Sequence, residues 1–402
     1  MVQLTEFDLA SPAFKANPYP AFAWLRTYDP VHQLISPDGQ PVWLITRYQD
    51  AEPVLRDERF VKDKRKLWSS EERTPASAAV ADLMDLGMLR FDPPDHARLR
   101  SLVSLSFTPR LMERWRGRIH EITDELIDAV EGKGSMDLIE EFAFPLPIQV
   151  ISEILGVSAE DCPKLHRLTN LIADAHGDAV AFQQAAQHLQ AFYDYLLALI
   201  ESKRQAPADD LVSKLLQAEA KGDRLSEREL QAMIFLLIIA GHVTTGNMIG
   251  NGMLALLTHP DQMDLLKQDP TLIKTAVEEF LRYWSPLALA TLRWAGEDLE
   301  FGGKQIRRGE EVAISLCAAN HDSEEFAEPD RLDITRQENR HLAFGKGIHY
   351  CLGAPLARIE GEIAISTLLR RLPNLRLQID PETLVWRPGT MVLGLYHLPV
   401  VF

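Results

Sequence analysis

One cysteine, surrounded by glycines, is the residue best placed to do chemistry. Residues 344–353 read Phe-Gly-Lys-Gly-Ile-His-Tyr-Cys-Leu-Gly, and a helical pattern follows to Arg371, with Pro355 near its start. Glycines permit tight turns and close approach of the backbone to a flat ligand, and proline suits the first turn of a helix. Amides of the turn and of the helix N-terminus favour a thiolate at Cys351. Such a thiolate would serve as a nucleophile or as the ligand of a soft metal. The alternative is a buried, inert cysteine.

The whole ten-residue pattern resembles the haem-binding signature of the cytochrome P450 family. The positions that match it are Phe344, Gly345, Gly347, His349, Cys351 and Gly353. The resemblance implies haem b as cofactor, with Cys351 as the axial thiolate ligand of its iron. A thiolate ligand pushes electron density onto the iron and favours O–O cleavage. The resemblance to the family extends over nearly the whole chain, from about residue 17 to about residue 400, and is closest to the soluble bacterial branch.

Four further residues resemble the family's contacts to the haem. His96 and Arg100 lie one helical turn apart, a pair that in isolation would indicate a solvated basic face. Beside the cysteine signature the pair resembles a clamp on a haem propionate. Arg293 and His349 match two other propionate donors, and Phe344 and Gly353 complete the predicted cofactor-binding set. Positive donors are the expected partners of a partly buried dianionic cofactor.

Residues 240–244 read Ala-Gly-His-Val-Thr in the middle of a long apolar helix. Without the resemblance, they indicate a buried helix with a small-residue contact. With it, Ala240 and Gly241 make room for dioxygen, and Thr244 directs hydrogen bonding to it. Val243 departs from the family's pattern, because most members have Asp or Glu there, and valine cannot relay a proton. Either water and hydroxyls of the substrate replace the acid, or coupling is poor, or the reaction is not simple hydroxylation.

The spacing Glu-x-x-Arg occurs four times and places the two charges one helical turn apart. The pairs are Glu113/Arg116, Glu201/Arg204, Glu279/Arg282 and Glu328/Arg331. We single out Glu279 and Arg282, because their apolar helix runs into the aromatic residues Tyr283 and Trp284. The resemblance implies that Arg331 joins this pair in a buried network that holds the cysteine loop. The other pairs are interpreted as surface pairs or chance.

Hydrophobic periodicity predicts a mainly α fold with small β-sheets. A capping box at Ser226 and Glu229 opens a helix that continues to about Leu257. Strands are expected at 42–46, 291–294, 312–315 and 392–396. The resemblance implies one haem-thiolate monooxygenase domain over residues 1–402, without a fused reductase. It also implies the cytochrome P450 fold, with the haem buried between the long central helix and the cysteine-loop helix.

Composition excludes several classes of protein. Of 402 residues, 42 are basic and 58 acidic, and a formal charge of −16 argues against binding nucleic acid through bulk charge. The three cysteines have no disulfide or metal-site spacing, which favours a reducing, cytoplasmic compartment. The N-terminus has no signal-peptide pattern, and the longest apolar run, 232–240, is far short of the roughly 20 residues that span a membrane.

A separate electron donor and an apolar substrate are expected. Residues 90–118 contain seven arginines and three acids, a local charge of +4 that would steer an acidic ferredoxin or flavodoxin, itself served by a reductase. The resemblance draws the pocket from 86–89, 173–182, 236–244, 287–291 and 392–393, which are mostly aliphatic. Its tentative lining residues are Leu287, Leu289, Val243, Val392 and Leu393.

The first functional hypothesis is therefore a monooxygenase. It would insert one atom of dioxygen, by hydroxylation or epoxidation, into a polyketide, macrolide, terpenoid or steroid. Val243 leaves open a second hypothesis, in which the same scaffold catalyses desaturation, ring coupling or peroxide-driven oxidation. A third is a haem-binding sensor or carrier without catalysis, against which Thr244 and the aliphatic pocket argue.

Overall fold

Helices make up most of the computed structural model, which describes residues 9, 11–36, 39–68, 83, 86–104, 106–174, 179–218 and 225–402. Side chains at 173–174, 179–187 and 218 also lie outside the description. The α-helices are α1 (Pro12–Ala16), α2 (Tyr19–Tyr28), α3 (Tyr48–Val54), α5 (Asp95–Ser104), α6 (Pro109–Glu113), α7 (Arg116–Glu131), α8 (Pro145–Leu155), α9 (Cys162–Asp174), α10 (Ala179–Gln205), α11 (Leu211–Ala218), α12 (Glu227–Thr258), α13 (Pro260–Gln268), α14 (Ile273–Tyr283), α15 (Leu316–Asn320) and α16 (Ala354–Arg371). The predicted mainly α class is confirmed.

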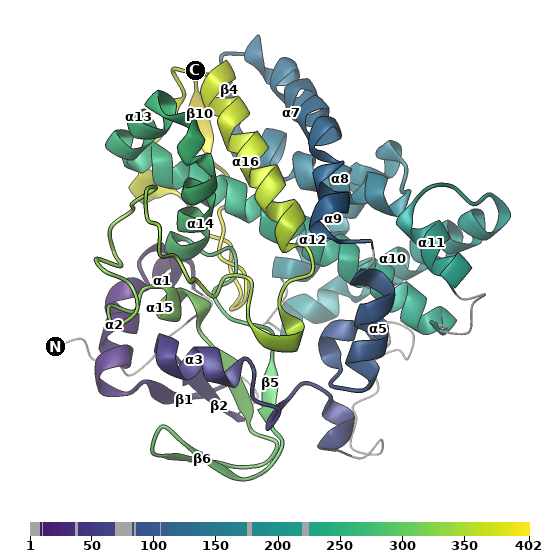
Figure 1. Ribbon diagram of the computed structural model, residues 1–402, viewed down its shortest axis with the longest axis vertical. Helices are drawn as coiled ribbons and strands as arrows, with labels where there is room; N and C mark the ends of the chain where they lie inside the picture. The colour runs from purple at the N-terminus through teal and green to yellow at the C-terminus, as the bar shows by residue number, and fades with distance from the viewer. Residues whose placement is uncertain are drawn as a thin grey trace.

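The strands form three small sheets. They are β1 (Val31–Ile35), β2 (Pro41–Ile45), β3 (Phe60–Val61), β4 (Ser135–Asp137), β5 (Arg293–Ala295), β6 (Leu299–Phe301), β7 (Lys304–Ile306), β8 (Glu311–Ile314), β9 (Arg376–Leu377) and β10 (Pro399–Val401). The largest sheet has the order β1-β2-β8-β5-β3, in which only β2 and β8 run parallel. Figure 1 shows it at one end of the molecule, below the helices.

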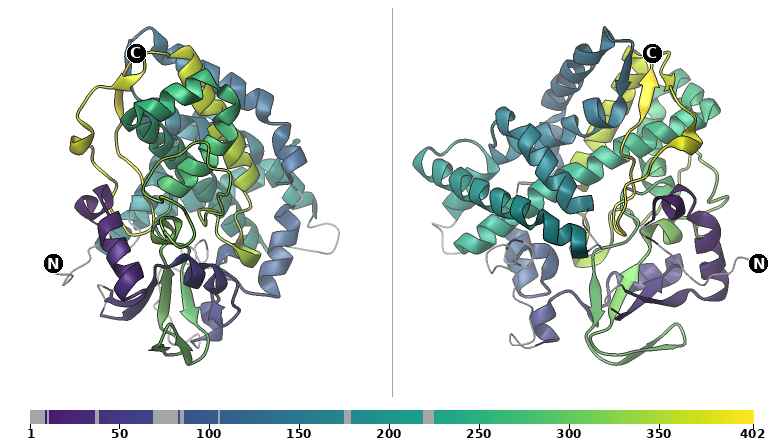
Figure 2. Two further views of the ribbon diagram at one scale, coloured as in Figure 1. Left: turned by 60° about the vertical axis from the view of Figure 1, so that its left-hand side comes forward. Right: turned by 180° about the vertical axis from the view of Figure 1, so that it is seen from behind.

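Three of the four expected strands coincide with β2, β5 and β8. The prediction of a strand over 392–396 is wrong. That segment forms only isolated bridges, from Val392 to Leu287 and from Leu395 to Trp386. The C-terminal strand β10 instead pairs with β4 and β9, and Figure 2 shows this return of the chain beside β4.

Helix α12 is the central element of the fold. Both bonds of the capping box are present, because the Ser226 side chain accepts from the Glu229 amide and the Glu229 carboxylate accepts from the Ser226 amide. The helix packs against α8, α9, α10, α14 and α16, so its apolar composition is explained by burial. Its length and hydropathy would also suit a membrane span, but 72% of the most apolar window is buried inside the protein.

Two glycines let neighbouring elements approach α12 closely. A Cβ at Gly250 would lie 2.4 Å from Ile139 Cδ1, and one at Gly252 would lie 2.9 Å from Phe280 Cδ2. Helix α16 packs against both α12 and α7 (Figure 1), and a Cβ at Gly252 would also lie 3.3 Å from its Ile365 Cδ1. The start of α16 and the cysteine loop before it therefore face the middle of α12.

Candidate active site

A cavity of about 220 Å³ lies between α12, the cysteine loop (344–353) and the first turns of α16. Ala240, Gly241 and Thr244 contribute to its wall from α12, and Cys351 from the opposite side. Cys351 is accessible because it opens to this cavity, whereas Cys162 and Cys317 are buried elsewhere. Burial raises the pKa of the Cys317 thiol to about 12. The cavity thus occupies the predicted place, between the long helix and the cysteine-loop helix.

The glycines of the cysteine loop have a conformational reason. Gly345 and Gly347 adopt φ values of 68° and 71°, which L side chains rarely adopt. A Cβ at Gly347 would also lie 2.9 Å from the Leu55 carbonyl oxygen. The loop then returns on itself, because the Cys351 amide donates to the Phe344 carbonyl over 2.9 Å.

Electrostatics at the Cys351 sulfur act in two directions. Although the sulfur opens to the cavity, the surrounding protein removes most of its water and so raises the pKa of the thiol. The amides of Gly353 and Ala354 and the guanidinium groups of Arg100 and Arg358 favour the thiolate. Gly353 is the N-cap of α16, and Pro355 lies in its first turn as predicted. The predicted amide support for a thiolate is therefore present, although burial outweighs it in the protein by itself. A metal ion on the sulfur would reverse that balance, because coordination deprotonates a thiol.

Basic side chains converge at one edge of the cavity. His96 and Arg293 are each only 3% exposed, and the rings of His96 and His349 lie 4.2 Å apart. Arg100 donates to the Tyr350 carbonyl over 2.8 Å, and Arg293 donates to the Thr291 carbonyl over 2.9 Å. Nε2 of His349 is buried without a hydrogen-bond partner in the protein. The structure thus brings together all four residues predicted to bind propionates.

Lys62 is a fifth basic group at this edge, which the sequence analysis missed. It is 2% exposed, and its ammonium group donates to Thr291 Oγ1 over 2.5 Å and to the Leu89 carbonyl over 3.3 Å. Burial, together with the charges of Arg293 and Arg90, holds the pKa of Lys62 well below its usual range. In the sequence it belongs to a charged run at 62–66 that looks solvated, and residues 64–66 are indeed exposed.

The donor set fits a dianionic cofactor. Among the described residues, no carboxylate lies within ion-pair distance of Lys62, Arg100 or Arg293. Buried cations without counter-charges are costly, and His349 offers a further unpaired nitrogen. Two carboxylate groups of a flat ligand above Cys351, as haem carries, would supply the missing partners.

The opposite wall is formed by α12. Thr244 lines the cavity, and its Oγ1 donates to the Ala240 carbonyl over 2.9 Å. Val243 is 2% exposed and packs in the core. His242 also turns away from the cavity, since its two ring nitrogens are bonded to His166 Nδ1 over 3.0 Å and to Thr169 Oγ1 over 3.2 Å.

The predicted substrate-pocket residues are only partly right. Leu287 lines the cavity, but Val243, Leu289, Val392 and Leu393 do not. Leu289 and Leu393 line a separate hollow of about 20 Å³. The apolar wall is instead formed by Met88, Leu89, Ile151, Leu236, Leu237 and Ala290. The expected contribution of 173–182 lies outside the described side chains.

Glu360 on α16 is the one carboxyl group on this wall among the described residues. It is 1% exposed, and its Oε2 atom has no hydrogen-bond partner in the protein. Burial therefore raises its pKa well above the ordinary value.

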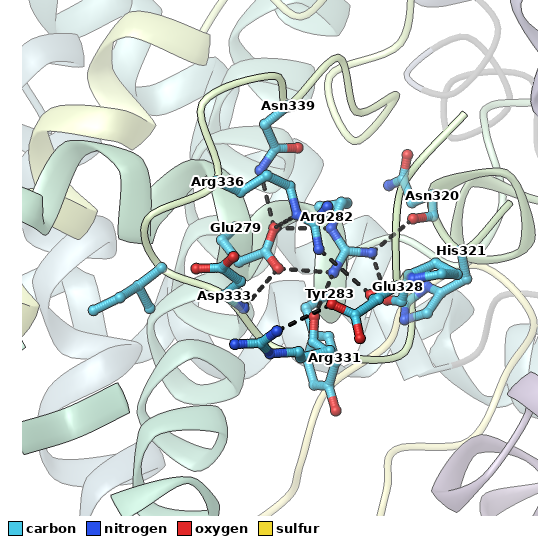
Figure 3. Close-up of polar contacts among 12 residues, drawn as sticks. Glu279, Arg282, Tyr283, Asn320, His321, Glu328, Arg331, Asp333, Arg336 and Asn339 are labelled. Carbon is cyan, nitrogen blue, oxygen red and sulfur yellow. Dashed lines mark hydrogen bonds and ion pairs between the residues drawn. The ribbon is translucent and has the colours of Figure 1, made fainter. Parts of the chain in front are cut away.

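The Glu279–Arg282 pair is buried and fastens the loop that leads to Cys351 (Figure 3). Both side chains are 0% exposed, and two parallel bonds of 2.8 Å join them. Arg282 also donates to the carbonyls of Asn320, Pro329 and Arg331, so all five of its N–H groups are used. The other three Glu-x-x-Arg pairs also form ion pairs, but their arginines are 34–61% exposed. The choice of this pair is confirmed.

The prediction that the Arg331 side chain completes the network is wrong. That side chain is 61% exposed and pairs with Glu328, and only its backbone carbonyl reaches Arg282. Arg336 takes the expected place: it is 11% exposed, and its Nε donates to Glu279 Oε2 over 3.1 Å. Asn339 and the Asp333 amide complete the shell around Glu279 (Figure 3).

Comparisons with known proteins agree with this geometry. The family described as Cytochrome P450 matches residues 12–391. A cytochrome P450 of Priestia megaterium is 49% identical over 370 residues, 90% of each chain. The vitamin D(3) 25-hydroxylase of Pseudonocardia autotrophica is 47% identical over 396 residues, 98% of this chain and 96% of that protein. The crystal structure of a myxobacterial cytochrome P450 in complex with myristic acid has a TM-score of 0.93 and 45% identity, covering 98% of both chains.

Proposed function

Because this chain belongs to the cytochrome P450 family, we propose that its cavity binds haem b with the Cys351 thiolate as axial ligand of the iron. The protein is a haem-dependent monooxygenase. When bound, a thiolate-ligated haem activates dioxygen so that one oxygen atom enters the substrate and the other leaves as water. The observation that carries the ligand assignment is that Cys351 alone of the three cysteines lines the cavity, to which Thr244 of α12 also contributes.

The chain's own residues would orient the cofactor. His96, Arg100, Arg293 and His349 would hold its propionates, and we add Lys62 to this set. Charge-assisted bonds to carboxylates are short and strong. In the protein, Arg100 and Arg293 bond to carbonyls, Lys62 bonds to a hydroxyl, and His349 Nε2 has no partner, so none of these groups is paired with an acid. On the other face, Ala240 and Gly241 leave room for dioxygen, and the Thr244 hydroxyl lies where it can bond to it.

We propose an apolar natural product as substrate. The wall above the cofactor position is aliphatic, and the basic side chains belong to the opposite edge. Relatives at 40–41% identity are named 6-deoxyerythronolide B hydroxylase and mycinamicin IV hydroxylase/epoxidase, and another is named vitamin D(3) 25-hydroxylase. A polyketide, macrolide, terpenoid or steroid, hydroxylated or epoxidised, fits this environment. Val243 keeps desaturation, ring coupling and peroxide-driven oxidation as the second candidate.

We propose that a separate acidic ferredoxin or flavodoxin, with its reductase, docks beside the cysteine loop. Ile348 and Tyr350 of this loop are 51% and 37% exposed, and Arg110 on α6 and Arg114 at its C-terminal end are exposed. The positive charge of segment 90–118 is smaller than its composition suggests. Three of its arginines pair with acids outside the segment: Arg98 with Glu229, Arg116 with Glu362 and Arg118 with Glu153. We expect the protein to work in the cytoplasm.

The decisive test is spectroscopic. Reduced protein treated with carbon monoxide should show the red-shifted absorption band of a thiolate-ligated haem, and its absence would refute the proposal. A panel of vitamin D3, testosterone, a macrolide and myristic acid should then be screened for spectral shifts. For a compound that shifts the spectrum, turnover under ¹⁸O-labelled dioxygen should place one labelled atom in the product. An unlabelled, dehydrogenated or coupled product would favour the second candidate.

A further inference from the structure

One face of α12 carries a row of polar side chains that begins at the cavity and continues away from it. Thr244, Asn247 and Asn251 are spaced at i, i+3 and i+7 and therefore share this face. Thr244 opens to the cavity, whereas Asn247 and Asn251 are 0% and 1% exposed. Polar side chains in the middle of an otherwise apolar, buried helix require a reason.

Asn251 has a structural reason, and Asn247 does not. The Asn251 amide nitrogen donates to the carbonyls of Leu393 over 3.0 Å and Trp284 over 3.3 Å. Neither Nδ2 nor Oδ1 of Asn247 has a hydrogen-bond partner in the protein. Leaving a buried donor or acceptor unsatisfied costs about 1–3 kcal/mol, so a purely structural role would favour an apolar residue at 247.

Other unpartnered polar atoms lie on or next to Asn251, about one helical turn beyond Asn247. Asn251 Oδ1 and the fully buried hydroxyl of Ser285 also lack protein partners. Ser285 follows Trp284, whose carbonyl Asn251 holds, and precedes Pro286, which lies on the cavity wall. The backbone at Gly394 closes over Asn247 so tightly that a Cβ there would lie 1.9 Å from Asn247 Oδ1. The unpaired donors and acceptors thus belong to α12, one and two helical turns beyond Thr244, and to the segment that follows α14 and contacts it.

The two residues before Thr244 cannot bring protons to it. Val243 is apolar and packed in the core. His242 uses both ring nitrogens for His166 and Thr169 on α9, away from the cavity. A buried amide with a free donor and a free acceptor is, in contrast, suited to ordered water, which typically makes about three hydrogen bonds to unsatisfied polar groups.

We propose that Asn247 is a positioning residue for proton delivery: with Ser285 it binds ordered water behind Thr244, and this water replaces the carboxyl group missing at 243. The inference rests on the proposed monooxygenase function. Each insertion, RH + O₂ + 2e⁻ + 2H⁺ → ROH + H₂O, takes its electrons from the donor protein and its protons from solvent. Each ordered water accepts one proton and passes one on. Thr244 Oγ1 does the same at the cavity, so neither the water nor the hydroxyl is consumed. The amide orients the water and is not itself protonated.

The test compares two ways of driving the same holoenzyme. Reduced nicotinamide with a ferredoxin and its reductase requires protons delivered through the protein, whereas hydrogen peroxide brings its own in RH + H₂O₂ → ROH + H₂O. Asn247→Leu keeps the side-chain size and removes the amide. Because proton transfer by positioned groups typically contributes about 10²–10⁴-fold, we expect product per nicotinamide to fall at least about tenfold. Peroxide-driven turnover of the panel compound that is oxidised should stay within about twofold.

Further readouts separate this proposal from a structural role. The holoenzyme crystal structure should show water bonded to Asn247, and Asn247→Leu should unfold in urea at the wild-type concentration or higher. Gln231→Leu is the matched control, a buried polar residue on the same helix that is not on the cavity wall, and it should leave both turnover ratios unchanged. If Asn247→Leu does not fold, Ser285→Ala removes one hydroxyl only and should lower coupling several-fold.

Unchanged coupling in Asn247→Leu, or in Ser285→Ala where that variant carries the test, would overturn the proposal. So would equal losses in both turnover modes, or a holoenzyme structure without water at the amide. The proposed function fails separately, because it is refuted by the carbon monoxide spectrum of the unsubstituted protein.

Discussion

Replacing Arg282 with alanine should separate the one buried Glu-x-x-Arg pair from its exposed counterparts. Arg282 directs all five N–H groups to protein acceptors: both carboxylate oxygens of Glu279 and three backbone carbonyls. The substitution leaves the Glu279 carboxylate, 0% exposed, with Arg336 as its remaining ion-pair partner. Removing one partner of a buried ion pair costs about 3–5 kcal/mol. Typical stabilities are about 5–15 kcal/mol, so this loss is a large share of the total.

The assay measures urea unfolding and the haem content of purified protein, as the ratio of haem to protein absorbance. Arg204→Ala and Arg331→Ala are the controls, because they break pairs of the same spacing at arginines that are 40% and 61% exposed. Exposed pairs contribute about 0–1 kcal/mol, so both controls should bind haem normally. Arg336→Ala should fall between, since Glu279 keeps its bidentate partner.

Two results would refute this reasoning. If Arg282→Ala is as stable and as haem-loaded as Arg204→Ala, the buried pair does not hold the loop. If Arg331→Ala lowers stability and haem content as much as Arg282→Ala does, the Arg331 side chain is part of the buried network in solution and is not exposed there.

Three other substitutions test the site. Cys351→Ser should abolish the red-shifted carbon monoxide band, whereas Cys162→Ser and Cys317→Ala should retain it; a normal band in Cys351→Ser would exclude the thiolate assignment. Lys62→Met should accelerate haem transfer to apomyoglobin by at least about tenfold, which corresponds to the loss of one charge-assisted bond of about 1.5–3 kcal/mol. Lys133→Met, which removes a lysine that is 55% exposed, should not accelerate it, and equal rates would remove Lys62 from the propionate set. Glu360→Gln should become increasingly more stable than wild type as pH rises. The reason is that the unfolded state loses the Glu360 proton near its ordinary pKa of 4.5, while burial raises the folded pKa and keeps the proton on. Wild-type stability should therefore fall relative to the glutamine variant by up to about 1.4 kcal/mol per pH unit above that value. A pH-independent difference between urea midpoints would show that Glu360 is ionised in the folded protein.

The parts of the site that lie close together in the sequence could be predicted from it. Within about ten residues, local sequence determines the conformation of the cysteine loop and the start of each helix. Glycine conformations, a capping box and a proline at a helix start are all local requirements. Their mutual placement then follows from burying an apolar helix. The confirmed helix bounds at 227–258 and 354–371 reflect this local control.

Residues fixed by long-range contacts could not be predicted in the same way. Arg331 and Arg336 lie five positions apart in one irregular segment, and which of them faces Glu279 depends on backbone bonds to distant residues. Lys62 is the one inward-pointing cation of a charged run, because β3 ends just before it and its amide bonds to Asp92. The same holds for Leu289: regular alternation would put Leu287 and Leu289 on one side of an extended chain, but only Leu287 lines the cavity.

The buried network acts on the cavity through the connecting loop and not by contact. Arg282 holds the Asn320 carbonyl, and the Asn320 side chain accepts from the Leu342 amide over 2.7 Å. Leu342 precedes Cys351 by nine residues, and within that interval the Gly345 amide bonds to the Leu342 carbonyl and the Cys351 amide to the Phe344 carbonyl. A continuous series of bonds therefore runs from α14 to the backbone of Cys351. Loosening its buried end would let the cysteine loop move relative to α12, so damage at Arg282 should appear as lost haem before it appears as altered chemistry.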